Sequence, residues 1–100
     1  MTVYEHRTSL TTVSGTVGTS TLYVPGGLLR QVLLRANTTS TLFRADLTDE
    51  NGTIRRHYGF HRGELNDMEI QLAVAGSFRL NITNAGPADD TFTVVLSVQE

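Results

Sequence analysis

Two segments of this chain alternate strictly between apolar and polar side chains, and this alternation limits the fold more than any other feature. In residues 77–83 the apolar positions are Phe78, Leu80 and Ile82. In residues 91–99 they are again every second residue, and Val95 alone interrupts the polar side: Phe92, Val94, Leu96 and Val98. A period of two places such residues on one face of a β-strand, whereas a helix would scatter them around its circumference. We therefore expect two strands, each with one buried face.

A hairpin is predicted between residues 41–48 and residues 53–60. The residues between them include Asn51-Gly52, the strongest short hairpin signal, because both residues accept positive φ. On the return strand, Ile54, Tyr58 and Phe60 are expected to share a face. Arg56 lies among them and is expected at an edge or in a pair, because a lone buried guanidinium is very costly.

Further strands are expected at residues 19–24, 28–36 and 69–75. Residues 28–36 are apolar on both faces, which is typical of a central strand, with a short helix as the alternative. Residues 61–67 and 84–90 are rich in turn residues and are expected to be loops. This spacing predicts an all-β fold: a single-domain antiparallel β-sandwich, jelly-roll-like, with about eight strands.

The first eighteen residues carry few large apolar side chains and allow two interpretations. They pair along a sheet edge, or they form an extended N-terminal arm over residues 1–18 that precedes a β-sandwich domain of residues 19–100. In the second case the arm is expected to become ordered on a partner by adding a strand to an exposed sheet edge. Deletion of residues 2–16 should then abolish that binding and leave the domain folded.

Composition excludes several classes of protein. The 100 residues suffice for one domain, and the absence of cysteine excludes disulfides and thiolate sites. The start of the chain has no signal-peptide pattern, so a cytoplasmic product is expected, and no apolar run is long enough to span a membrane. The net charge of −2 gives no bulk attraction to nucleic acid, although all eight basic residues are arginine, a residue suited to interfaces.

No pattern of residues indicates catalysis, a cofactor or a metal. His57 and His61 would lie about 13 Å apart on one face of a strand, too far apart to chelate one ion. Residues 46–52 resemble part of a calcium loop but lack its spacing, so solvated turn carboxylates are the simpler interpretation, with a looser calcium site there or at Asp89 and Asp90 as the alternative. No nucleophile elbow and no phosphate-binding loop occurs. We expect a protein that binds and is not an enzyme.

Three stretches resemble small β-sandwich virion proteins of tailed bacteriophages, of the capsid decoration or cement type. They are residues 25–33 (PGGLLRQVL), the strand–hairpin–strand from Phe43 to Ile54, and residues 92–100 (FTVVLSVQE). The resemblance covers roughly three quarters of the chain and contains no catalytic motif. It implies a structural virion protein that binds the major capsid protein and copies of itself, with a trimer at a local three-fold axis by analogy. It also implies assembly in the host cytoplasm, without nucleic acid or membrane as a partner.

The interface residues expected on this basis come from the first strand and from exposed arginines: Thr2, Val3, Tyr4, Arg7, Arg30, Arg44 and Arg79. Two alternatives remain open. The chain is a tail, fibre or adaptor component, or it is a carbohydrate-binding sandwich. The latter usually presents aromatic side chains to sugars, and this chain has no Trp and three Tyr.

Overall fold

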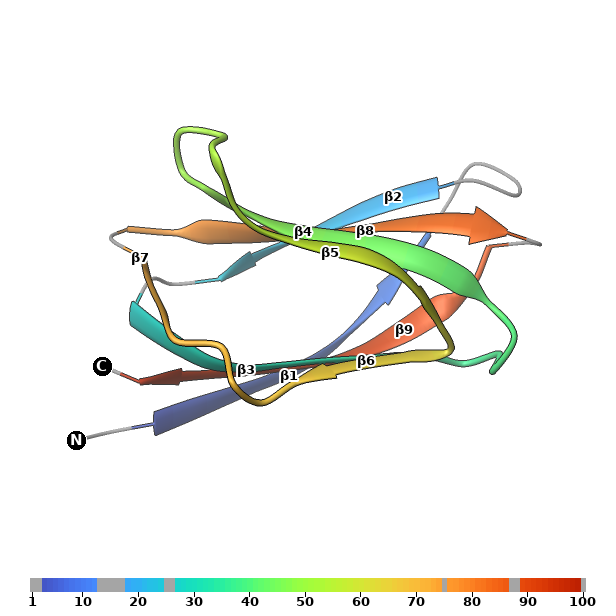
Figure 1. Cartoon of the computed structure of the whole chain (residues 1–100), viewed down its shortest axis with the longest axis horizontal. Coiled ribbons are helices and arrows are strands. Elements are labelled where there is room, and N and C mark those ends of the chain that lie inside the picture. The colour runs from blue at the N-terminus through green and yellow to red at the C-terminus, as the bar shows by residue number, and fades with distance from the viewer. Residues whose placement is uncertain (1–2, 13–17, 25–26, 75, 87–88, 100) are drawn as a thin grey trace.

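Two antiparallel β-sheets pack face to face in the computed structural model of the chain (Figure 1). The structure describes residues 3–12, 18–24, 27–74, 76–86 and 89–99. Within them the strands are β1 (Val3–Thr11), β2 (Gly18–Val24), β3 (Gly27–Ala36), β4 (Leu42–Asp49), β5 (Ile54–Arg62), β6 (Glu64–Asp67), β7 (Leu72–Val74), β8 (Phe78–Gly86) and β9 (Thr91–Gln99). The described part of the chain includes no helix that is long and apolar enough to cross a membrane.

The strand order confirms the predicted antiparallel sandwich. Sheet A has the order β1-β9-β3-β6, with β7 also paired to β3, and sheet B has the order β2-β8-β4-β5. Since β9 occupies one side of β3, both β6 and β7 lie along its other side and share one edge of sheet A. The nine strands therefore fill eight positions, close to the predicted number.

The core lies between the sheets and consists of the side chains that alternate in the sequence. Phe43 of β4, Phe78 of β8 and Phe92 of β9 are its largest fully buried side chains. The rings of Phe43 and Phe92 meet edge to face across the two sheets, with centroids 5.0 Å apart and planes at 68°. Edge-to-face contact is a preferred aromatic geometry because it brings the positive ring edge to the negative ring face. The alternation thus holds the two sheets together.

Strand β3 is central in sheet A, as its apolar character on both faces predicted. Leu29, Val32 and Leu34 are fully buried against sheet B. On the opposite face, Leu33 is half-buried and pairs with Val95 of β9, whose side chain is only 3% exposed. The outer face of sheet A therefore contains a small apolar centre, which explains why Val95 interrupts the polar side of its strand.

The connection between the two sheets after β5 differs from the sequence prediction. Residues 61–67 were expected to be a loop, but they contain the end of β5, a turn at Gly63 and all of β6. Gly63 has φ +78°, and a Cβ there would lie 2.6 Å from the Thr39 carbonyl oxygen. Only glycine fits that turn without strain. The strand predicted at residues 69–75 is shorter than expected, since β7 covers Leu72–Val74 alone.

Strand β1 takes the first of the two interpretations open for the N-terminal segment. Its residues 3–11 pair with β9 in nine consecutive antiparallel pairs, from Val3 with Gln99 to Thr11 with Thr91. Residues 1–2 and 13–17 lie outside the described residues, so the boundary at residue 18 stays a prediction. Deletion of residues 2–16 would remove an edge strand of sheet A, and the expectation that the domain stays folded without it does not fit this arrangement.

Candidate interaction surface

The predicted interface residues lie on two opposite faces of the sandwich. Val3 and Arg7 pair with Gln99 and Val95, and both point away from the core on the outer face of sheet A. Arg44 and Arg79 alternate with buried core residues, so they lie on the outer face of sheet B. A single flat partner cannot contact all four at once. Thr2 and the side chain of Tyr4 lie outside the described residues.

Arg30 belongs with the sheet A group. A register shift between Leu29 and Gln31 leaves Arg30 without an opposite residue on β9, and its side chain is exposed. Its Nη1 donates to the Oε1 of Gln99 at 2.6 Å. Since Gln99 also pairs with Val3 on β1, Arg30 and Val3 lie near the same end of the outer face. Val3, Arg7 and Arg30 therefore share one face, separate from Arg44 and Arg79.

The outer face of sheet A carries mainly polar and charged side chains, with a few apolar ones among them. Ser97 of β9 donates to the Oε1 of Gln31 at 3.1 Å, and the hydroxyls of Thr11 and Thr91 lie 3.1 Å apart. Two opposite-charge pairs lie on this face, Arg7 with Glu5 and Arg35 with Glu64, whereas Arg30 bonds to the uncharged Gln99. Such exposed pairs contribute little stability. The charges of this face are therefore nearly balanced around the buried Val95.

Among the side chains that the structure describes on the outer face of sheet B, one is a large exposed aromatic ring. The pairing of β4 with β5 shifts between Phe43 and Ala45, which pair with His61 and Tyr58 respectively. This bulge turns Phe60 outward, where it is 58% exposed and lies under the Arg44 guanidinium at 5.8 Å from the ring centroid. The expectation that Ile54, Tyr58 and Phe60 share a face is therefore wrong, because Tyr58 is buried while Ile54 and Phe60 are each 58% exposed. A stacked arginine and aromatic pair is a composition that protein interfaces favour.

On the side of the sandwich formed by β5 and β6, the carboxylate of Asp67 bridges the two sheets. Asp67 of β6 accepts a hydrogen bond of 2.7 Å from the Tyr58 hydroxyl and one of 3.3 Å from Arg56 Nη2, both on β5. Burial, and then the bond to Asp67, raise the pKa of Tyr58 well above its usual range, so the phenol stays protonated and donates. Arg56 lies on an edge strand and is paired with Asp67, in agreement with the prediction that its guanidinium would not be buried alone.

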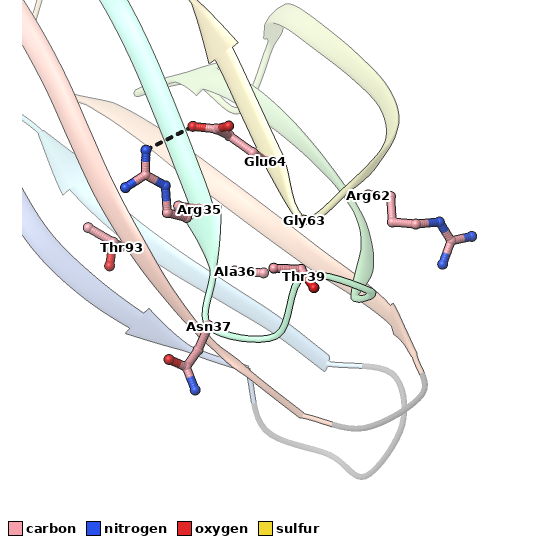
Figure 2. A pocket seen from close by; sticks show the side chains of 8 residues that line it. All are labelled: Arg35, Ala36, Asn37, Thr39, Arg62, Gly63, Glu64 and Thr93. Atoms are coloured by element: carbon pink, nitrogen blue, oxygen red, sulfur yellow. Dashed lines mark hydrogen bonds and ion pairs between the residues drawn. The ribbon is translucent and has the colours of Figure 1, made fainter.

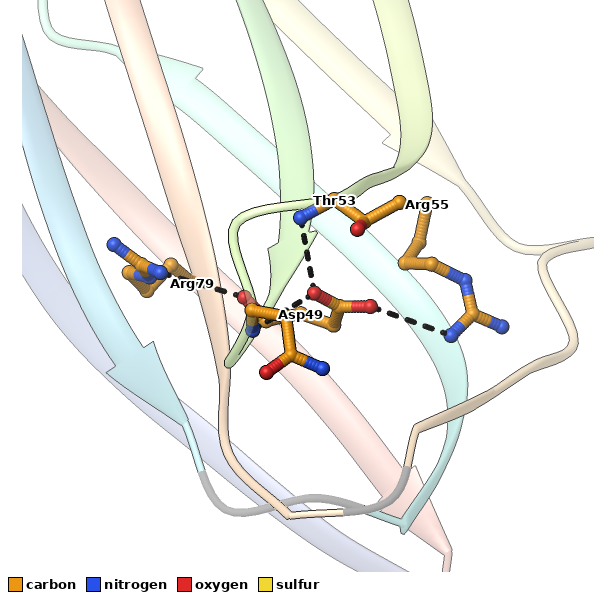
Figure 3. Close-up of polar contacts among 5 residues, drawn as sticks. Asp49, Thr53, Arg55 and Arg79 are labelled. Carbon is orange, nitrogen blue, oxygen red and sulfur yellow. Dashed lines mark hydrogen bonds and ion pairs between the residues drawn. The ribbon is translucent and has the colours of Figure 1, made fainter.

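In the hairpin turn between β4 and β5, the carboxylate of Asp49 accepts hydrogen bonds from backbone amides of the same turn (Figure 3). Asp49 Oδ1 accepts hydrogen bonds of 3.0 Å from the amides of Asn51 and Thr53, and Oδ2 lies 3.8 Å from Arg55. Gly52 has φ +83°, as the Asn-Gly signal predicted. The carboxylate proposed as a calcium ligand is thus occupied by the turn's own amides.

The histidines are not brought together either. The bulge in β5 separates His57, which pairs with Asp46 on the outer face, from His61, whose ring lies 6.4 Å from the buried Phe43 ring. The prediction that they share a face is therefore wrong. Among the described residues, no group of three His, Cys, Asp or Glu side chains is placed to hold a metal ion.

A buried polar cluster joins four segments at one end of the sandwich. The carboxylate of Asp90 accepts hydrogen bonds from the Thr38 amide at 2.9 Å, the Thr41 hydroxyl at 2.7 Å and the Thr91 amide at 2.8 Å. Burial by itself would raise the pKa of Asp90, but these bonds outweigh it and lower the pKa below its usual value. Thr12 completes the cluster by accepting from the Asp90 amide at 3.1 Å and from Asn84 Nδ2 at 3.2 Å. This carboxylate is a structural group.

One groove of about 400 Å³ lies beside the Arg35–Glu64 ion pair (Figure 2). It is lined by Arg35, Ala36, Asn37, Thr39, Arg62, Gly63, Glu64 and Thr93. Figure 2 shows the Arg62 side chain extending away from the Arg35–Glu64 pair. The groove contains no aromatic side chain on which a sugar ring could stack.

Sequence reasoning missed three residues that shape these surfaces. Phe60 was assigned to the wrong face because a bulge leaves no signal in an alternating pattern, although the Gly59 before it is the residue type that often marks one. Asp67 and Asp90 were taken for loop residues, because the partners of Asp67 lie on the preceding strand and those of Asp90 include the distant Thr41. Pairwise contacts of that kind have no local sequence signature.

No protein-family model and no curated protein sequence matches this chain. Among solved structures it is similar to the enzymatically active domain of tailspike protein 4 of bacteriophage CBA120, with a TM-score of 0.40 and 15% sequence identity. The match covers 94% of this chain and 19% of that chain, so this protein spans about a fifth of the tailspike domain's length. A likeness this distant carries no argument about function.

Proposed function

We propose that this chain is a structural protein of the virion of a tailed bacteriophage, and more specifically a capsid decoration protein that binds the head surface in many copies. Its partners are then the major capsid protein and copies of itself, and it joins the head during assembly in the host cytoplasm. The starting point is the resemblance of residues 25–33, the hairpin from Phe43 to Ile54 and residues 92–100 to proteins of that type.

The outer face of sheet A is the observation that carries the proposal. It presents polar and charged side chains around the buried Val95 and the half-buried Leu33, and it includes the pairs Arg7–Glu5 and Arg35–Glu64. A decoration protein needs a rigid surface that fits a shell by shape, because weak contacts are summed over many copies.

The path of the chain supports a jelly-roll assignment, which forms part of the proposal. The chain passes from one sheet to the other at each connection except the β4–β5 hairpin and the β6–β7 connection. The resulting orders, β1-β9-β3-β6 and β2-β8-β4-β5, are those of two interlocked Greek keys. Viral capsid domains and lectins are among the proteins that use this architecture.

The proposal assigns binding and no catalytic step. The pKa of Tyr58 is raised and that of Asp90 is lowered, and both groups are held in hydrogen bonds that join separate segments of the fold. Catalysis needs titratable groups that face a reactant in a pocket. The charged groups beside the groove, Arg35 and Glu64, already form an ion pair with each other.

The copy number of the chain in purified particles from its source tests this proposal. Quantitative mass spectrometry against the major capsid protein should give hundreds of copies per particle, close to an integer ratio to the shell subunit. A few copies per particle would replace the decoration role by a tail, fibre or adaptor role. Absence from the particles would overturn the virion proposal and make the carbohydrate-binding sandwich the next function to test.

A further inference from the structure

The two sides of the sandwich differ in how their edge strands are protected. On the side formed by β5, β6 and β7, which we call the closed side, the edge of sheet A is divided into two short strands. Strand β5 there has two register shifts, one between Phe43 and Ala45 and one between Leu47 and Thr48 of its partner β4. Bulges, short strands and charged side chains are the means by which proteins prevent unwanted strand pairing. The closed side uses all three.

The side formed by β1 and β2, which we call the open side, has no bulge and no short strand, and its only charged side chains are on β1. The nine pairs of β1 with β9 and the seven pairs of β2 with β8 run without a register shift. Neither strand contains proline, and β2 contains no charged residue. Within the described residues, β1 pairs with β9 alone, so the outer edge of residues 3–10 offers backbone donors and acceptors to another strand. A long, regular edge of this kind is a template for another strand.

We propose that β1 pairs antiparallel with β1 of a second copy of this chain, about a two-fold axis that passes beside His6. The two four-position sheets A then form one continuous sheet across the dimer. The charges of β1 support a second copy as the occupant, because this pairing places Glu5 opposite Arg7 of the second copy, and Arg7 opposite its Glu5. Opposite charges directly across two antiparallel strands stabilise the pair.

The same charges select one register among the alternatives. A shift of two residues in one direction places Glu5 opposite Glu5, and a shift of two in the other direction places Arg7 opposite Arg7. Like charges directly opposite one another are destabilising. A shift of one residue would turn the core-facing side chains of one copy to the outer face of the joined sheet. Only the register centred on His6 combines matched faces with matched charges.

The geometry of the side chains permits this contact. Glu5 and Arg7 lie on the outer face of sheet A, with side chains 46% and 72% exposed. Within one chain they form an ion pair with each other, so dimerisation would exchange this intrachain pair in each copy for two pairs between the copies, without any change in the core. Because one strand edge is a small interface, the dimer should dissociate on dilution, with a dissociation constant of about micromolar or weaker. The inference concerns the free protein and does not depend on the proposed virion role.

Charge complementation between two variants tests the proposal. Wild type at roughly 100 μM should sediment as a dimer and dissociate on dilution. Glu5→Arg makes both positions positive and Arg7→Glu makes both negative, so each variant alone should sediment as a monomer. An equimolar mixture of the two should sediment as a heterodimer, because each Arg then faces a Glu of the other copy.

Controls separate this result from a folding defect or a general charge effect. Circular dichroism should show wild-type strand content for both variants, because both side chains are exposed. Arg35→Glu changes a charge on the same outer face, but on β3, away from the open side, and should leave the wild-type dimer intact. A wild type that stays monomeric or sediments as a trimer would overturn the proposal, as would two monomeric variants that remain monomers when mixed.

Discussion

The hydroxyl of Tyr58 donates a hydrogen bond of 2.7 Å to the carboxylate of Asp67, and this bond joins β5 of sheet B to β6 of sheet A. Tyr58→Phe removes it and leaves the ring in place. Because hydrogen bonds to charged groups are the stronger ones, we expect the free energy of unfolding to fall by about 1.5–3 kcal/mol in urea titrations. Phe60→Leu, which changes an exposed ring on the same strand, is the matched control.

The raised pKa of Tyr58 adds a pH dependence to the same variant. A group whose pKa is higher in the folded protein contributes stability below its unfolded value, and that contribution is lost as the pH rises toward the folded value. Wild-type stability should therefore fall above pH 10.0, the ordinary value for tyrosine, more steeply than that of Tyr58→Phe. Parallel curves for the two proteins would contradict this role.

Asp90→Asn should destabilise the protein at neutral pH. The amide nitrogen of Asn cannot accept the hydrogen bonds that Thr38, Thr41 and Thr91 donate to the carboxylate, so at least one buried donor loses its partner. We expect a loss of about 1–3 kcal/mol by urea unfolding. Asp89→Asn, at an exposed neighbouring position, should change stability by less than about 0.5 kcal/mol.

Because the pKa of Asp90 is lowered, the difference in stability between wild type and Asp90→Asn should depend on pH in acid. Its stabilisation is complete above the unfolded value of 3.8 and is lost as the pH falls toward the lower folded value. The gap between wild type and Asp90→Asn should therefore narrow below pH 3.8. If this difference in the free energy of unfolding stayed constant in acid, the negative charge of Asp90 would not be what stabilises the cluster.

Gly63→Ala should destabilise the fold far more than Gly59→Ala. At Gly63 the backbone has φ +78° and the new Cβ would meet the Thr39 carbonyl oxygen, whereas at Gly59 nothing lies within 4 Å of it. We expect a loss of about 1–3 kcal/mol at Gly63 and less than about 1 kcal/mol at Gly59, measured by thermal and urea unfolding. Equal effects would mean that the turn into β6 tolerates a side chain.

Phe43→Ala and Phe60→Ala test the bulge in β5. Phe43 is fully buried, and its truncation should cost about 3–5 kcal/mol. Phe60 is 58% exposed, so its truncation should cost less than about 1 kcal/mol. A large loss at Phe60 would show that its ring packs in the core, as the uninterrupted alternation of the sequence suggested.

Much of the fold could be predicted because alternation and turn chemistry are local signals. In residues 78–82 and 92–98, apolar and polar side chains alternate because the two faces of each strand are buried and exposed in turn. Asn51-Gly52 forms the predicted hairpin turn, with Gly52 at positive φ. The sequence of β3 predicts a central strand because both of its faces are apolar, and in the structure its outer face is partly covered. These features depend on neighbours in the sequence, so the sequence displays them.

The interaction surface was less predictable because it depends on pairing between distant segments. The arginines chosen for their residue type, such as Arg7 and Arg44, lie on opposite faces once the strands are ordered. The bulges that expose Phe60 and the bridge made by Asp67 arise only when β4, β5 and β6 meet. No pattern within one strand encodes which edge of a sheet stays unpaired.

The proposed dimer, in which two copies pair through β1 on the open side, is tested most directly by a cysteine cross-link at His6. The chain has no native cysteine, so His6→Cys introduces a single thiol. The proposed pairing brings the two Cα atoms at position 6 to about 4.5–5.5 Å, within the range of a disulfide. In Ser9→Cys the two thiols would lie six residues apart along the joined strands, about 20 Å. Under oxidised glutathione, His6→Cys should give a covalent dimer on a non-reducing gel and Ser9→Cys should not. No dimer from His6→Cys, or equal amounts from both variants, would contradict the claim.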